Sequence, residues 1–150
     1  MRIPAIPAAL LAACIGGAAL PARAEPVLTR VAAPIDEVLF SVESAILDRG
    51  LVIDSVSHVG DMLARTGADV GSDRPLFTRA DVFLFCSAIL SRRVMEADLT
   101  NIAYCPYGIF VYESAAEPGV SVVGYRSMPE GPMKEVEALL AEIVAEATAR

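Results

Sequence analysis

The chain has 150 residues, of which 12 are basic, 19 are acidic and one is histidine, and its formal charge is −7. At this length a single domain with one core is expected. The negative charge argues against nucleic-acid binding, because phosphate backbones are held mainly by lysine and arginine. An apolar share of 55% excludes a disordered chain.

The first 24 residues have the pattern of a secretory signal peptide. Arg2 supplies a positive charge, residues 8–20 are apolar, and the Ala-Arg-Ala at 22–24 fits a cleavage site. The apolar run is shorter than the roughly 20 residues that a transmembrane helix needs, so no membrane span is expected. We predict cleavage after this site, which leaves residues 25–150 as a single domain in the periplasm or outside the cell. A Leu-Ala-Ala-Cys run ending at Cys14 has the shape of a lipoprotein box, and lipidation there is the alternative to soluble export.

The next part of the chain alternates between strand and helix patterns. Residues 26–32 are β-branched at their centre and predict a strand. Apolar residues then recur at helical spacing until Gly50, which predicts a helix with a glycine stop. Residues 51–58 predict a second strand, and residues 58–70 predict a short helix that ends near Gly71.

The second half begins, after a polar loop, with five successive apolar residues at 82–86, which predict a strand buried on both faces. Ser87 is a suitable N-cap for a following helix. Residues 109–113 and 120–126 predict two strands of a hairpin. A final helix is expected from Pro132. Its apolar stripe consists of Met133, Val136, Leu140, Ile143, Val144 and Ala147.

The predicted element order is β-α-β-α-β-α-β-β-α. This order favours an α/β protein with a two-layer α+β arrangement, in which helices pack on one face of a mixed sheet. Because the strand at 82–86 is apolar on both faces while one face of such a sheet stays uncovered, we also expect a homodimer.

Signatures of common enzymes are absent from the sequence. It contains no Cys-x-x-Cys, no His-Glu-x-x-His and no Gly-x-Ser-x-Gly. With one histidine, a nucleophile–base arrangement would have to use His58 or a carboxylate. We therefore assign no catalytic residue and no particular cofactor, and expect a binding protein rather than an enzyme.

Two cysteines, Cys86 and Cys105, remain after export into an oxidising compartment. A disulfide between them would close a loop of about 20 residues and stabilise the fold by about 3 kcal/mol. A shared ligand or metal site, with Cys86 at a helix N-terminus that favours the thiolate, is the alternative, and two unrelated cysteines are the third. The intervening loop is long enough to bring the two Cα atoms within about 7 Å of each other.

A metal site at the cysteines would also include His58 and Met62. These two residues are four apart and would share one helix face. With Cys86 and Cys105 they would form a soft set of nitrogen and sulfur ligands suited to copper(I) or zinc. The other interpretation is that His58 simply bonds a backbone group.

Several stretches of the sequence resemble the domain of unknown function 302 family. They are the Asp-Val-Phe-Leu-Phe-Cys-Ser-Ala run at 81–88, the Met-Glu-Ala-Asp at 95–98, the run beginning Cys-Pro-Tyr-Gly at 105–113, and the helix pattern at 37–50. No single motif is diagnostic, but their order and spacing together are specific. The resemblance covers residues 32–144.

The resemblance implies a small two-layer α/β domain, commonly dimeric, without an established activity. It also implies a shared site, because exported members pair a strand-end cysteine with a Cys-Pro before the hairpin, which matches Cys86 and Cys105.

From these observations we expect a periplasmic accessory protein that binds a small ligand or a metal at a site lined by Cys86 and Cys105. A thiol-dependent redox or sulfur-handling protein is the first alternative, and a structural module stapled by a disulfide is the second. The expected partners are a second copy of the chain and a small molecule, a metal ion or a periplasmic protein.

Overall fold

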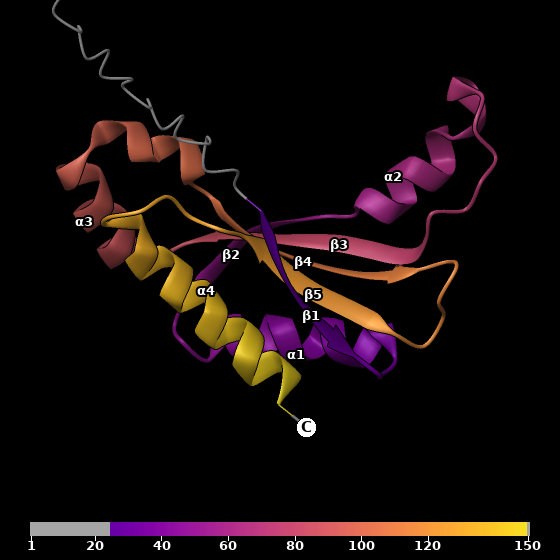
Figure 1. The fold of residues 1–150 in the computed structure, drawn as a ribbon, viewed down its shortest axis with the longest axis horizontal. Coiled ribbons are helices and arrows are strands. Elements are labelled where there is room, and N and C mark those ends of the chain that lie inside the picture. Colours follow the sequence, from indigo (N-terminus) through magenta and orange to yellow (C-terminus); the bar gives the residue numbers. More distant parts are fainter. Residues whose placement is uncertain (1–24, 150) are drawn as a thin grey trace, which may run out of the picture.

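The computed structural model describes residues 25–149, so the expected leader and Cys14 lie outside the described residues. The strands alternate with helices until the hairpin, as predicted, but two short 3₁₀ helices interrupt the expected order (Figure 1). The elements in chain order are β1 (Pro26–Val31), α1 (Ile35–Leu47), β2 (Val52–Ser57), α2 (Val59–Thr66), η1 (Ala68–Val70), β3 (Phe77–Cys86), α3 (Ala88–Ala97), η2 (Leu99–Tyr104), β4 (Tyr107–Ser114), β5 (Ser121–Arg126) and α4 (Met133–Thr148).

The five strands form one sheet in the order β1-β5-β4-β3-β2. Every neighbouring pair is antiparallel, so the α+β class is confirmed while the expected mixed sheet is wrong. The reason lies in the connections, because α1 carries the chain from the β1 edge to the β2 edge, and α3 with η2 joins two antiparallel neighbours. Hydrophobic periodicity locates a strand, but it does not say which strand lies beside it.

The helices do not all lie on one side of the sheet. α1 and α4 pack against each other beneath one face, as expected, whereas α2 lies on the opposite side (Figure 1). Gly60 of α2 approaches β3 so closely that a Cβ atom there would lie 2.7 Å from the backbone nitrogen of Ala80. The expectation that the helices cover a single face is therefore wrong for α2.

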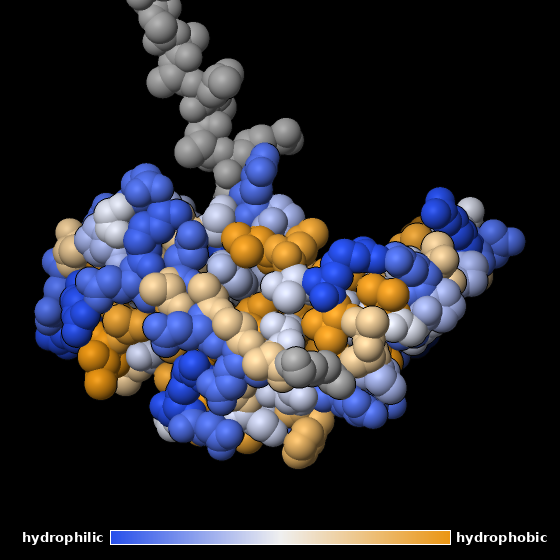
Figure 2. Space-filling model, turned by 60° about the horizontal axis from the view of Figure 1, so that its bottom comes forward, coloured by the Kyte–Doolittle hydropathy of each residue, from blue (hydrophilic) through white to orange (hydrophobic). Residues whose placement is uncertain are grey.

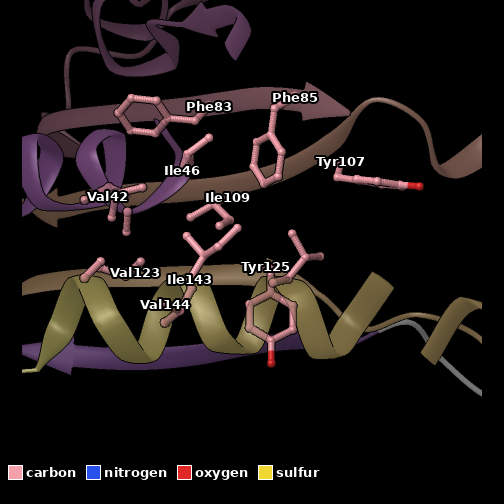
Figure 3. Close-up of a cluster of buried hydrophobic side chains, with 14 of the residues drawn as sticks. Val42, Ile46, Phe83, Phe85, Tyr107, Ile109, Val123, Tyr125, Ile143 and Val144 are labelled. Carbon is pink, nitrogen blue, oxygen red and sulfur yellow. The ribbon is translucent and has the colours of Figure 1, made fainter. Parts of the chain in front are cut away.

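The core lies between the sheet and the pair α1–α4 (Figure 3). Phe85 and Ile109 point from the sheet into the space between the sheet and Ile143 of α4, and these residues are buried together with Phe83. The predicted stripe of α4 is buried along its whole length, so this helix follows its sequence pattern. Burying such apolar area is the main stabilising contribution to a fold of this kind.

The other face of the sheet carries Val82, Leu84 and Phe110, because successive strand residues point to opposite faces. These three side chains are half-buried, so the strand predicted to be buried on both faces is fully buried on only one. We call this surface the open face. Figure 2, turned so that the side of α1 and α4 comes forward, shows hydrophobic side chains scattered among hydrophilic ones. Within residues 25–149, no helix is long and apolar enough to cross a membrane.

Candidate functional site

The cysteine pair lies at one end of the sheet. Cys86 is the last residue of β3 and Cys105 follows η2; their Cα atoms are 6.6 Å apart and their sulfurs lie at disulfide-bonding distance. The predicted separation of about 7 Å is confirmed. The predicted N-cap of α3 is also present, since the Ser87 hydroxyl accepts a hydrogen bond from Leu90 N at 3.3 Å.

The return from α3 to Cys105 is held by polar contacts. The Asp98 carboxylate accepts hydrogen bonds from the hydroxyl and the backbone nitrogen of Thr100, at 2.7 and 2.8 Å. These two contacts hold the pKa of Asp98 below its usual range. Asn101 Nδ2 donates to the carbonyl oxygen of Val94 at 2.8 Å and ties η2 to α3. The segment that leads to the second cysteine is therefore fixed by its own hydrogen bonds as well as by the sulfurs.

Behind the cysteines lies a buried tyrosine. Tyr107 is 1% exposed, and its ring meets Phe85 edge to face with the ring centres 6.4 Å apart. Its hydroxyl is 2.9 Å from Ser91 Oγ, which lies 4.0 Å from Cys105 Sγ. A buried phenol needs such a partner, so Ser91 satisfies Tyr107 and places a hydroxyl beside the cysteine pair.

A cavity of about 360 Å³ opens on the open face next to the cysteine pair. Its volume falls within the range of small-molecule sites. Cys105 directly precedes Pro106, and Cys86 lies two residues beyond Leu84, so each cysteine adjoins a wall of the cavity. The lining residues are Pro26, Val82, Leu84, Ala103, Tyr104, Pro106, Gly108, Phe110, Arg126 and Met128.

Two glycines shape the floor of this cavity in different ways. The Phe110 ring rests on Gly124, where a Cβ atom would lie 2.6 Å from the ring and 2.5 Å from a backbone oxygen. At Gly108 a Cβ atom would meet only the side chains of Leu84 and Val82, at 3.5 and 3.6 Å, which is ordinary contact. Gly124 therefore lets the aromatic ring lie flat, whereas Gly108 leaves space within the cavity.

The rim of the cavity carries the charged groups. Among the lining residues within 25–149, Arg126 is the only charged one. Beside it, Met128 N donates to the Glu137 carboxylate, which also accepts from Lys134 Nζ at 3.0 Å. The Met128 contact and then Lys134 hold the pKa of Glu137 below its usual range, while burial and then Glu137 raise the pKa of Tyr125.

His58 and Met62 lie elsewhere. His58 Nδ1 is 2.7 Å from Asp81 Oδ1, and the other oxygen of this carboxylate accepts from Arg79 Nε at 3.0 Å. Asp81 is five residues before Cys86 on the same strand, a distance of roughly 16 Å at the usual rise. The structure thus brings the two cysteines together but not the four-residue metal set. Among residues 25–149, no three His, Cys, Asp or Glu side chains lie close enough to hold a metal ion.

Sequence reasoning named the cysteines but not the cavity beside them. The run at 82–86 did contain a signal, because apolar residues on the second face of a strand require a cover or a cavity. Phe110 carries the same signal within the hairpin. Nothing in the sequence singled out Arg126, because its place at the cavity depends on neighbours that other strands bring.

Three comparisons place the chain among known proteins. The sequence matches the family model described as "Domain of unknown function DUF302" over residues 27–149, as its resemblance predicted. A crystal structure of the uncharacterized conserved protein DUF302 from Bacillus stearothermophilus is similar, with a TM-score of 0.58 and 17% sequence identity over 82% of this chain and 94% of that chain. At this identity the likeness concerns the fold alone. A comparison with the curated proteins found no match.

Proposed function

Because this chain belongs to the family described as domain of unknown function DUF302, a description that names no activity, we propose a function from its own geometry. The protein is an exported binding module that holds a small, largely apolar molecule in the cavity of the open face. The cysteine pair serves as the staple that fixes one wall of this cavity.

The position of the cavity beside the cysteine pair is the observation that supports this function. Ala103 and Tyr104 precede Cys105 and Pro106 follows it, so this link positions one wall against the strand that forms the floor. We favour a small molecule over a metal, because the thiolate is the metal-binding form of cysteine and a disulfide removes it.

Filling the cavity tests the proposal directly. The neutral fluorescent probe N-phenyl-1-naphthylamine should bind the exported protein and gain fluorescence. Gly108→Val should abolish this gain, since a valine there fits the strand and projects into the cavity. Ala141→Val, on the exposed side of α4, is the control and should bind the probe normally. Equal binding by the wild type and Gly108→Val would contradict the proposal.

A thiol-dependent redox function is the second candidate. It is supported by the half-buried position of both Cys86 and Cys105 and by the Ser91 hydroxyl beside one of them. In that case the exported protein should exchange its disulfide readily, and the reduced form should titrate below the free-cysteine value of about 8.5. If Cys86 and Cys105 stay oxidised and unreactive in a thiol buffer, the result favours a purely structural disulfide.

Export itself is part of the proposal, and it rests on the leader pattern of the sequence. The intact mass of the exported protein should correspond to a chain that starts at Glu25. A mass that fits a diacylglyceryl-modified Cys14 would replace soluble export with membrane anchoring.

We also propose that the protein forms a homodimer through its open face. Leu28 is 51% exposed on this face, and Val82 and Phe110 are only half-buried. A second copy would cover Leu28 and close over the cavity that Val82 and Phe110 line, so the ligand would lie between the two copies. Light scattering should give twice the mass of one chain at micromolar concentration, and a monomer there would contradict the dimer.

A further inference from the structure

The cavity differs from an ordinary apolar pocket in one respect, which is its single positive charge. Most of its lining is aliphatic or aromatic, with Leu84 and Phe110 on the floor and Met128 on the rim. Arg126 is placed there as the last residue of β5, where its strand register pairs it with Pro26 of the edge strand. One guanidinium group therefore borders an apolar space.

This guanidinium has no protein partner within the described part of the chain. Several other arginines meet carboxylates: Arg30 pairs with Glu117 at 2.5 Å, and Arg79 pairs with both Asp36 and Asp81. Arg65 and Arg74 have no ion pair with a described residue either, but they do not line this cavity. No ion pair or side-chain hydrogen bond among residues 25–149 involves the Arg126 guanidinium, although its backbone belongs to β5. In a chain with an excess of acidic side chains, a cation left over beside a cavity is available to a ligand.

One acidic group near this rim, the carboxylate of Glu137, is already engaged. The Glu137 carboxylate accepts from Met128 N and from Lys134 Nζ, so its charge is compensated within α4 and the segment before it. An incoming anion would therefore meet the guanidinium of Arg126 without displacing an internal pair.

These features define a ligand class. We propose that the cavity binds an amphipathic monoanion, such as a carboxylate with an apolar tail, and that Arg126 is the residue that selects the anion. The planar guanidinium can donate two parallel hydrogen bonds to a carboxylate, while the tail lies against Leu84 and Phe110. The guanidinium would repel a cationic ligand. This inference rests on the proposed function of the cavity.

Three ligands of equal chain length separate the charge from the apolar contact. Octanoate, octanol and octylamine are tested for displacement of N-phenyl-1-naphthylamine from the exported protein at neutral pH. We expect octanoate to displace the probe at about tenfold lower concentration than octanol, because a charge-assisted hydrogen bond is added to the same tail. Octylamine should be the weakest of the three.

Variants of the arginine complete the test. Arg126→Gln should remove the preference for octanoate and leave displacement by octanol unchanged. Arg126→Lys should retain part of the preference, since it keeps the charge without the two-pronged donor. Arg92→Gln, which removes an equally positive charge from the exposed side of α3, should behave as the wild type.

The outcomes distinguish this inference from the function on which it rests. If Gly108→Val abolishes probe binding but octanoate and octanol displace the probe equally, the cavity is a binding site without a preference for anions. That result would support the proposed function and contradict this inference. The inference would also be contradicted if Arg126→Gln weakened displacement of the probe by octanol as strongly as displacement by octanoate. Arg126 would then only shape the cavity. Failure of the probe to bind the wild type would remove the proposed function itself.

Discussion

The C-terminal end and the middle of β3 are both joined to neighbouring elements, but by different chemistry. At the C-terminal end Cys86 meets Cys105 beside a cavity whose single charge, Arg126, has no side-chain partner among the described residues. At the middle of the strand Asp81 is 4% exposed and accepts hydrogen bonds from both His58 and Arg79. The paired charges around Asp81 have a structural role, whereas the unpaired charge of Arg126 beside apolar space is the feature on which the proposed ligand site rests.

Removing the covalent joint should have the largest effect. The double variant Cys86→Ala/Cys105→Ala should lose about 3 kcal/mol of unfolding free energy, because the unfolded chain regains the freedom of the closed loop. Denaturant unfolding measures this loss, and the probe should bind more weakly as the wall loosens. A reducing agent should then change the wild type but not the variant. Equal stability of the two proteins would show that the cysteines do not staple the fold.

Removing the polar joint should cost less and spare the cavity. Asp81→Ala should lower the free energy of unfolding by about 2 kcal/mol, because it removes a buried acceptor while its partners reach solvent. Asp54→Ala, at an exposed position on β2, is the control and should change stability by less than about 0.5 kcal/mol. Probe binding should persist in both variants. Loss of probe binding in Asp81→Ala would mean that the middle of β3 and its C-terminal end are not independent.

The smallest effect is expected at the rim and depends on pH. The pKa of Glu137 is lowered in the fold, so this residue contributes stability above its ordinary pKa of about 4.3, and the contribution is lost as the pH falls through the lower, folded value. Glu137→Ala should therefore be about 1 kcal/mol less stable than the wild type at neutral pH, with the difference closing in acid. Urea unfolding at both pH values measures this. Glu142→Ala, on the exposed side of α4, should show no such pH-dependent difference.

The sequence predicted elements best where one local rule decided the structure. α4 was predicted together with its buried stripe, because uninterrupted apolar spacing at 3.6 residues needs no knowledge of distant contacts. β3 was predicted only from residue 82, although it begins at Phe77. Its first residues looked like a loop, since Thr78 and Arg79 are polar and find their partners, Glu113 and Asp36, on other elements.

The candidate site was likewise predictable only in part. The proximity of Cys86 and Cys105 follows from chain length and strand order, so it could be anticipated. The role assigned to Arg126 could not, because a missing partner is a property of the assembled neighbourhood and has no sequence signal. The relative direction of the strands could not be predicted for a related reason, since pairing is decided between segments that are far apart in the chain.

The pairing of β1 with β5 sets an order in which the sheet can be completed. β1 is an edge strand whose hydrogen-bonded neighbour comprises Ser121–Arg126, almost a hundred residues later. The first strand to be synthesised therefore has no place in the sheet until nearly the whole chain is present, and contacts between such distant segments form late and slowly. The sheet therefore cannot be completed at its β1 edge until β5 has been synthesised.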